Sequence, residues 1–327
     1  MTRVLIVGCG RIAGSYNETD EARILSHVVA LRRAGADIVG CVDQDAARAR
    51  RFAERWSIGG WGVDLGAALD RYAPELVVDC TPAGARLVVA SASLAAPTVR
   101  AILIEKPLGS TAADAIALRA RIRASGKPAI VGYQRAFDGC YLETEALLRR
   151  GDLGRLRRVV ALAYGGALAN MSHLLERTMA MAGRPREAAL IGAPILEDDG
   201  DPGLCFSVSF EDDVEGTFLA VPRAGPGLIE LDLIGSEGRL RISDSERRVE
   251  LSRALASPDG VARPIEAITA GHLPAPDEEA IRHVVDAALT ATRDPKHDVA
   301  LIDRAAEIVI MIDSLHLTGR YARRSAA

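Results

Sequence analysis

Short apolar runs alternate with helical patterns along the first third of this 327-residue chain. Four of the runs have the length and residue types of buried strands: residues 3–8, 36–43, 75–82 and 101–107. Parallel strands need a crossover between them, usually a helix, so this alternation is typical of a parallel sheet with helices on both faces. The sequence therefore predicts an α/β domain built on a doubly wound Rossmann sheet.

The pattern changes after a helix predicted over Thr111–Ala124 and one more strand at 129–133. A further helix is followed by runs with strand character, at residues 156–164, 204–210, 214–222, 228–235, 239–243 and 247–253. Turn signals between several of them favour antiparallel neighbours. Two helices close the chain, and the last is expected to pack back on the first domain. We predict a Rossmann domain over 1–125 and an α+β domain over 126–327, with an open, mostly antiparallel sheet that binds substrate and mediates assembly.

The predicted second sheet has covering helices for one face only. Residues 204–210 and 228–235 carry apolar side chains that would then form a large exposed patch. A symmetric homodimer or homotetramer through this sheet is the expected way to cover it.

Composition excludes several classes of protein. The net charge of −4, with no basic block, argues against nucleic acid as the main partner. The five cysteines form no CxxC pair, which fits neither a disulfide framework nor a zinc site, and no metal is expected. The sequence shows no signal peptide and no apolar run long enough to span a membrane. The cytoplasm is the expected location.

A glycine-rich loop follows the first strand, with Gly8, Gly10 and Ala13 in a GxGxxA pattern. Such a loop brings backbone N–H groups close to a dinucleotide pyrophosphate. Asp43 ends the second strand, where a carboxylate would accept hydrogen bonds from the adenosine ribose and repel a 2′-phosphate. NAD is therefore expected, and NADP should bind less well. The alternative interpretation is purely structural: the glycines form only a turn, and Asp43 is only a helix cap.

The interval between Gly8 and Asp43 is 43 − 8 = 35 residues, against about 20 in the compact motif. The polar, acidic stretch at 15–25 is the expected place of the extra residues. It would form a loop near the cofactor or lengthen the first helix.

A lysine follows a predicted buried strand in the sequence Glu105-Lys106-Pro107. Ligands of open parallel sheets bind at the carboxyl ends of the strands, and Thr81-Pro82 ends the preceding strand at the same edge. Thr81 and Lys106 are therefore expected at the nicotinamide end of a dinucleotide. A partly desolvated lysine can exchange a proton with a substrate hydroxyl. Taken alone, however, a lysine at a strand end is more often a solvated loop residue.

The order of these motifs resembles the Gfo/Idh/MocA family of NAD(P)-dependent oxidoreductases over essentially the whole chain. The resemblance implies hydride transfer at a carbinol carbon of a sugar, nucleotide-sugar, inositol or related polyol. It also implies that Lys106 is catalytic and that Glu105 fixes the loop and the end of the cofactor. The residues expected at the cofactor are Gly8, Gly10, Arg11, Ile12, Asp43, Thr81, Pro82, Glu105 and Lys106.

A second constellation lies at Asn170 and His173, where a glycine-rich turn leads into an amphipathic helix. A subgroup of the family with an N-x-S-H motif resembles this stretch. The resemblance implies that the histidine contacts the reacting hydroxyl and that Asn170 orients it, so both are taken as catalytic and substrate-binding. Read without the family, Asn170 is a helix N-cap and His173 a structural residue. The other histidines are expected to be structural or solvated.

The chain departs from the family pattern at two positions. Arg86 stands where many relatives have a histidine, and Ala136 replaces the second of two arginines. Gln134 and Arg135 remain as substrate-binding candidates beside Lys106, whereas Arg86 is expected to be a helix surface charge.

The leading hypothesis is an NAD-dependent dehydrogenase or reductase with Lys106 as the main proton shuttle. One alternative is a glycosidase of the same fold that uses NAD transiently and has no net redox. Another is a degenerate member that binds dinucleotide and acts as a sensor or scaffold.

Overall fold

The computed structural model describes residues 1–198, 200–255, 257, 265–268, 277, 279–294 and 299–323. The chain divides into two compact units. The first comprises Met1–Gln134 and Glu278–Ile310, and the second comprises Arg135–Asp277 and Met311–Ala327. The first unit extends past residue 125 because one more strand pairs at the edge of its sheet. Among the described helices, none is both long enough and apolar enough to span a bilayer.

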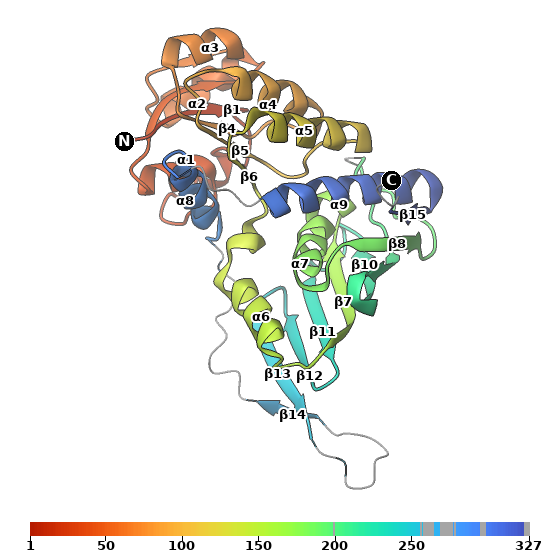
Figure 1. The fold of residues 1–327 in the computed structure, drawn as a ribbon. Coiled ribbons are helices and arrows are strands. Elements are labelled where there is room, and N and C mark those ends of the chain that lie inside the picture. Colours follow the sequence, from red (N-terminus) through yellow and green to blue (C-terminus); the bar gives the residue numbers. More distant parts are fainter. Residues whose placement is uncertain are drawn as a thin grey trace. The chain divides into compact units, whose positions relative to one another are not determined.

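The first unit is built on a six-stranded sheet in which every pair is parallel (Figure 1). In spatial order the strands are β3 (Trp61–Gly62), β2 (Asp37–Val42), β1 (Arg3–Val7), β4 (Leu76–Asp79), β5 (Ala101–Ile104) and β6 (Ala129–Val131). All four residues of β4 and of β5 are buried, as strands covered on both faces require. The predicted doubly wound α/β fold is confirmed.

Helices cover both faces of this sheet, with α1 packed against α8 and α4 against α3 and α5 (Figure 1). Their bounds are α1 (His27–Arg33), α2 (Ala46–Arg55), α3 (Leu65–Tyr72), α4 (Arg86–Ala95), α5 (Ala112–Ser125) and α8 (Ile281–Ala291), with short 3-10 turns η1 (Ser15–Asn17) and η2 (Ala83–Ala85). The helix predicted from Thr111 forms because the threonine side chain accepts a hydrogen bond from Asp114 N and Gly126 ends it in the left-handed conformation. The long helix α9 (Val299–Thr318) contributes residues to both units.

The extra residues between Gly8 and Asp43 loop out of the first helix. His27 N donates to the carbonyl of Ile12 at 3.0 Å and Val28 N to that of Ala13 at 2.9 Å, so α1 continues the turn that follows the glycine loop. The buried side chain of Asn17 organises the loop. Its amide nitrogen donates to the carbonyls of Asp20 and Arg23, and its oxygen accepts from Leu25 N and the Ser26 hydroxyl.

The second unit is built on a nine-stranded sheet, and among the strand pairs that the structure describes only β7–β10 is parallel. In spatial order the strands are β14 (Ile265–Ile268), β13 (Arg248–Ala254), β12 (Gly238–Ser243), β11 (Ile229–Gly235), β7 (Leu156–Tyr164), β10 (Glu215–Val221), β9 (Phe206–Phe210), β8 (Pro185–Leu190) and β15 (Arg320–Ala322). The predicted mostly antiparallel sheet is confirmed. Strands β8, β14 and β15 were not predicted, and they pair at the two margins of the sheet.

Besides the last part of α9, the described helices of this unit are α6 (Gly139–Arg150) and α7 (Ser172–Ala182), which pack together. A five-residue π-type turn, η4 (Ala167–Met171), leads directly into α7. Two 3-10 turns complete the described elements: η3 (Gln134–Phe137) and η5 (Glu211–Asp213).

The apolar side chains of this sheet are not exposed as predicted. Phe206, Val208 and Phe210 are buried, whereas the intervening Ser207 and Ser209 point to the other face. In β11 the buried leucines likewise alternate with Glu230 and Asp232, which pair with arginines of β12. The expectation that these two segments form a large exposed apolar patch is therefore wrong, because strand alternation turns their apolar side chains into the core.

Candidate active site

The glycine loop has the backbone that a dinucleotide needs. Gly8 has a φ of +87°, and a Cβ there would lie 2.8 Å from the carbonyl carbon of Cys80, so no other residue fits without a shift. A Cβ at Gly10, in contrast, would meet no atom within 4 Å. The space beside Gly10 is open, as the approach of a pyrophosphate requires, and the loop therefore fits the predicted cofactor.

Asp43 ties the end of β2 to this loop. Its carboxylate accepts hydrogen bonds from Cys9 N and from Asp45 N, both at 2.9 Å. Arg48, from the first turn of α2, also lies against it, with 3.2 Å between Nη1 and Oδ1. The Arg48 side chain is 48% exposed. The sequence interpretation missed this arginine, because only the helical turn brings it back to the end of β2.

Lys106 is half-buried and lies two residues after the end of β5. The peptide bond between Lys106 and Pro107 is cis. Lys106 N donates to the side chain of Glu105 at 3.2 Å, and Glu105 N donates to the carbonyl of Asp79 at the end of β4. Backbone contacts thus join the ends of β4 and β5, which carry the predicted nicotinamide-side residues.

The carboxylate of Glu105 is buried under this turn and meets His27, with 2.8 Å between Nε2 and Oε1. It lies so close to the backbone after β6 that a Cβ at Gly132 would be 2.6 Å from Oε1. Burial raises the pKa of Glu105, but the His27 hydrogen bond and the charges of His27, Arg86 and Lys106 outweigh it and lower the pKa below its ordinary value. Glu105 is therefore an anion, and His27 is a partner that the sequence pattern did not reveal.

Asp79, the last residue of β4, is a second buried carboxylate. Its Oδ1 accepts from Thr81 N at 2.9 Å and from the Thr81 hydroxyl at 2.5 Å. Burial raises the pKa of Asp79 to about 6, although these hydrogen bonds and the Arg86 charge oppose the rise. The hydroxyl of Thr81 is thus held by Asp79.

Arg86 is not the surface charge that was expected. It is 5% exposed, and its guanidinium donates to the carbonyl of Thr81 at 2.9 Å and to the carbonyl of Pro107. The expectation failed because Arg86 is the first residue of α4, at the end of the helix that adjoins the strand termini, rather than on its outer face. Pro82 itself is exposed, as is Arg11, whose guanidinium lies 4.9 Å from the centre of the Tyr16 ring.

In the second unit, Asn170 lies in the π-type turn η4 and His173 in the first turn of α7, where it is buried. The side chain of Asn170 donates to the carbonyl of Tyr164 at 2.8 Å. Asp201 caps the start of η4 by accepting from Leu168 N and Ala169 N, which the sequence pattern did not indicate. Insertions of this π type occur often at functional sites.

Arg135 is paired with a carboxylate of its own unit. Its Nε donates to Glu246 Oε1 at 2.5 Å, and the Tyr141 hydroxyl donates to the same oxygen. Glu246 belongs to the β12–β13 connection, where Asp244 and Ser245 also have positive φ. Gln134, the neighbouring substrate-binding candidate, is half-buried at the start of η3.

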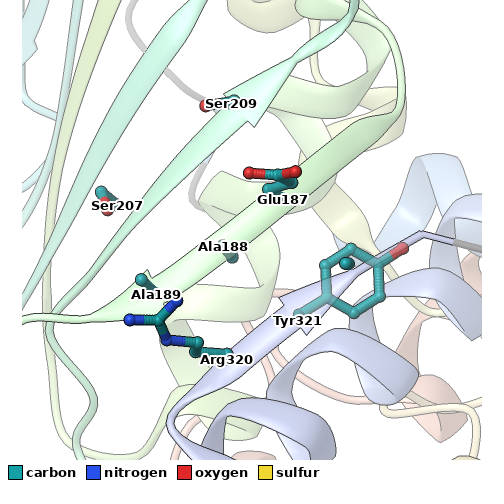
Figure 2. Close-up of a pocket in the computed structure, with 8 residues that line it drawn as sticks. Glu187, Ala188, Ala189, Ser207, Ser209, Arg320 and Tyr321 are labelled. Carbon is teal, nitrogen blue, oxygen red and sulfur yellow. The ribbon is translucent and has the colours of Figure 1, made fainter.

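A hollow of about 320 Å³ lies along β8, β9 and β15 of the second sheet (Figure 2). Its lining consists of Glu187, Ala188, Ala189, Ser207, Ser209, Arg320, Tyr321 and Ala322. None of the predicted cofactor or substrate residues lines it.

The described residues therefore bring together most of the predicted cofactor set within the first unit. The loop of Gly8 touches the end of β4, and Asp43, Thr81, Glu105 and Lys106 follow neighbouring strands of that sheet. Asn170 and His173 are placed close together in the second unit. Their catalytic roles remain predictions.

The curated relatives of this chain include two inositol dehydrogenases. The chain is 27% identical over 259 residues to the myo-inositol dehydrogenase Hyg17 of Streptomyces leeuwenhoekii, an alignment that covers 72% of this chain and 75% of that protein. It is 31% identical over 153 residues to the inositol 2-dehydrogenase of Acidothermus cellulolyticus, which covers 46% of this chain and 42% of that protein. The second alignment thus spans less than half of either protein.

Solved structures share the fold along the whole chain. The crystal structure of an NAD binding oxidoreductase from Klebsiella pneumoniae superposes with a TM-score of 0.78 and 16% identity, covering 99% of both chains. Residues 2–133 match the family model GFO_IDH_MocA, described as an oxidoreductase family with an NAD-binding Rossmann fold. This match covers the glycine loop, Asp43 and Lys106, so residues 2–133 are similar to the NAD-binding domain of that oxidoreductase family.

Proposed function

We propose that this dehydrogenase or reductase, which acts on CH–OH groups, transfers hydride between NAD and a secondary alcohol or ketone of an inositol, a sugar, a nucleotide-sugar or a related polyol. The observation that carries the proposal is the Lys106 turn. It is held by the buried, ionised Glu105 at the carboxyl edge of the sheet that carries the open glycine loop. A proton-exchanging group and a dinucleotide-binding loop at one edge of a parallel sheet suit hydride transfer.

The residues of the first unit would hold the cofactor. The backbone of Gly8 and Gly10 would receive the pyrophosphate, and Asp43 the adenosine ribose. Bound NAD would supply a hydride-accepting ring. Thr81, Glu105 and Lys106 would lie at the nicotinamide end.

Lys106 would take the hydroxyl proton as hydride leaves the carbinol carbon, or return it in the reverse direction. His173, from the second unit, would hold the reacting oxygen or share the proton, and Asn170 would orient it. The likeness to the N-x-S-H subgroup supports this assignment. Residues 126–327 would then form the substrate-binding and oligomerisation domain, with Gln134 and Arg135 as further substrate contacts.

The substrate class rests on the inositol dehydrogenases from Streptomyces leeuwenhoekii and Acidothermus cellulolyticus. A polyol ring offers several secondary hydroxyls, and a site that hydrogen-bonds them would discriminate strongly against analogues that lack one. Inositols are therefore the first compounds to test, followed by free sugars and nucleotide-sugars.

The experiment is a panel of these compounds with purified protein and NAD, monitored at the NADH absorbance band. Substrate-dependent NADH formation is the expected result. Cleavage of a glycoside without net NADH would instead indicate the NAD-using glycosidase. Tight NAD binding with no change in any compound would indicate a sensor or scaffold. Either result would overturn the proposal.

Assembly and location complete the proposal. The protein would form a homodimer or homotetramer through the face of the second sheet on which Ser207, Ser209, Glu230 and Asp232 lie. Light scattering at micromolar concentration tests this, and a monomer would contradict it. Four of the five cysteines are buried as free thiols, and this fits the cytoplasmic location that we propose.

A further inference from the structure

We propose that Arg86 is a positioning residue that holds the turn of Lys106 against the loop of Thr81. This inference rests on the proposed function, because it concerns the loops that would carry the nicotinamide-side residues. It concerns a residue whose position in the sequence predicted only a solvated charge.

The geometry of the contact carries the proposal. The guanidinium donates to the carbonyl of Thr81, two residues after β4, and to the carbonyl of Pro107, three residues after β5. One planar group with several donors in a fixed fork can bridge two carbonyls in this way, whereas an ammonium on a flexible stem is a point charge. Arg86 therefore joins the loop after β4 to the loop after β5, and the proposed chemistry depends on the relative position of these two loops.

Burial and two nearby carboxylates stabilise the Arg86 side chain in this position. The side chain is 5% exposed and lies near two buried carboxylates, Asp79 and Glu105. Without the guanidinium, both acids would lose a compensating positive charge in a site shielded from water, where unpaired charges are costly. The cation is thus fixed by charge as well as by its hydrogen bonds.

The consequence for turnover follows from the precision that hydride transfer requires. A displacement of about 1 Å at a reacting group can lower a rate by roughly 10²-fold. Arg86 contacts backbone, not the expected substrate, so its loss should lower kcat while the KM of the substrate changes little. The glycine loop and Asp43 hold the other end of the cofactor, so NAD affinity should fall only slightly.

The test compares Arg86→Met, Arg86→Lys and a matched control, Arg177→Met. Arg177 is also a buried arginine, at 2% exposure, but it pairs with Glu176 and Glu145 in the second unit. For Arg86→Met we expect kcat to fall by roughly 10- to 100-fold, with less than about threefold change in substrate KM. Arg86→Lys should recover only part of kcat, and Arg177→Met should lose thermal stability while keeping kcat.

A second readout does not depend on any substrate. Acetylation of lysines by an N-hydroxysuccinimide ester, followed by mass spectrometry, reports how readily the Lys106 amine is reached by a reagent in solution. Lys127, whose ammonium donates to the carbonyl of Ala96, is the internal reference. Lys106 should react several-fold faster in Arg86→Met than in the wild type, relative to Lys127, and at the wild-type rate in Arg177→Met.

The outcomes separate the two proposals. If no CH–OH compound is turned over by the wild type, the proposed function fails, whereas the labelling still tests the role of Arg86. Unchanged labelling in a folded Arg86→Met would overturn the positioning role, as would wild-type kcat in that variant. Full recovery by Arg86→Lys would show that a positive charge alone suffices, and it would overturn the bridging role of the guanidinium. Failure of both Arg86 variants to fold would assign the residue to stability and also overturn the proposal.

Discussion

The imidazole of His27 is hydrogen-bonded to the carboxylate of Glu105 across 78 positions of sequence, with 2.8 Å between Nε2 and Oε1. His27 begins α1 immediately after the loop that Asn17 organises, and its side chain is fully buried. The extra residues between the glycine loop and α1 therefore leave the helix in place, and its first residue reaches the carboxylate beneath Lys106. This contact helps to keep Glu105 ionised.

Replacing His27 by leucine should destabilise the protein by about 1–3 kcal/mol, because a buried acceptor loses its partner. His27→Gln can present an amide N–H near the position of Nε2 and should recover part of the loss. The free energy of unfolding in urea measures both variants. A leucine variant as stable as the wild type would show that the pair contributes nothing to the folded state.

Replacing Lys106 by methionine should lower the rate of hydride transfer by about 10²–10⁴-fold, the usual contribution of one acid–base group. NAD affinity should stay within about threefold, because the glycine loop and Asp43 would hold the rest of the cofactor. His173→Ala should lose less rate than Lys106→Met. Single-turnover kinetics and an NAD titration provide the measurements, and wild-type hydride transfer in Lys106→Met would rule out the proposed role.

Replacing Asp43 by alanine should narrow the preference for NAD over NADP. The substitution removes the carboxylate that would repel a 2′-phosphate and leaves Arg48, now 3.2 Å from Asp43, free to bind one. The double variant Asp43→Ala/Arg48→Ala is the control and should lose the gain in NADP affinity. Titration of both cofactors tests this. Equal NADP affinity in the single and double variants would show that Arg48 does not bind the 2′-phosphate.

Replacing Asp79 by asparagine should flatten the pH dependence of stability between about pH 4 and pH 6. Burial raises the pKa of Asp79 from 3.8 to about 6, so the folded state binds this proton more tightly than the unfolded chain. The wild type therefore loses stability from this group as the pH rises through that window, by up to about 3 kcal/mol. Asp79→Asn has no such proton, so its stability relative to the wild type should be higher at pH 7.5 than at pH 4.

Urea unfolding at the two pH values checks this prediction. Asp303→Asn serves as a control, because that carboxylate lies in the same unit and pairs with the half-exposed Arg123. The same difference between Asp79→Asn and wild type at both pH values would contradict a raised pKa for Asp79.

The sequence by itself determined the features that depend on near neighbours and on periodicity. The alternation of strand and helix specified the parallel sheet, because buried strands and amphipathic helices have distinct repeats. The pattern around Gly8 specified a tight turn, and the structure shows why only glycine fits there, against the backbone of Cys80. Asp43 could be placed because the end of β2 lies beside the end of β1 in any such sheet.

The tertiary structure alone decided the contacts between distant segments. Arg86 reaches Pro107, His27 reaches Glu105 and Arg135 reaches Glu246 only because separate strand ends and turns are packed together. No local pattern encodes which polar side chain such packing buries. The residues next to an arginine in the sequence can be the same whether distant segments cover its side chain or leave it in solvent. A buried charge is costly unless it is paired or hydrogen-bonded. Glu105 therefore contacts His27, Asp79 contacts Thr81, and Arg86 lies near both carboxylates.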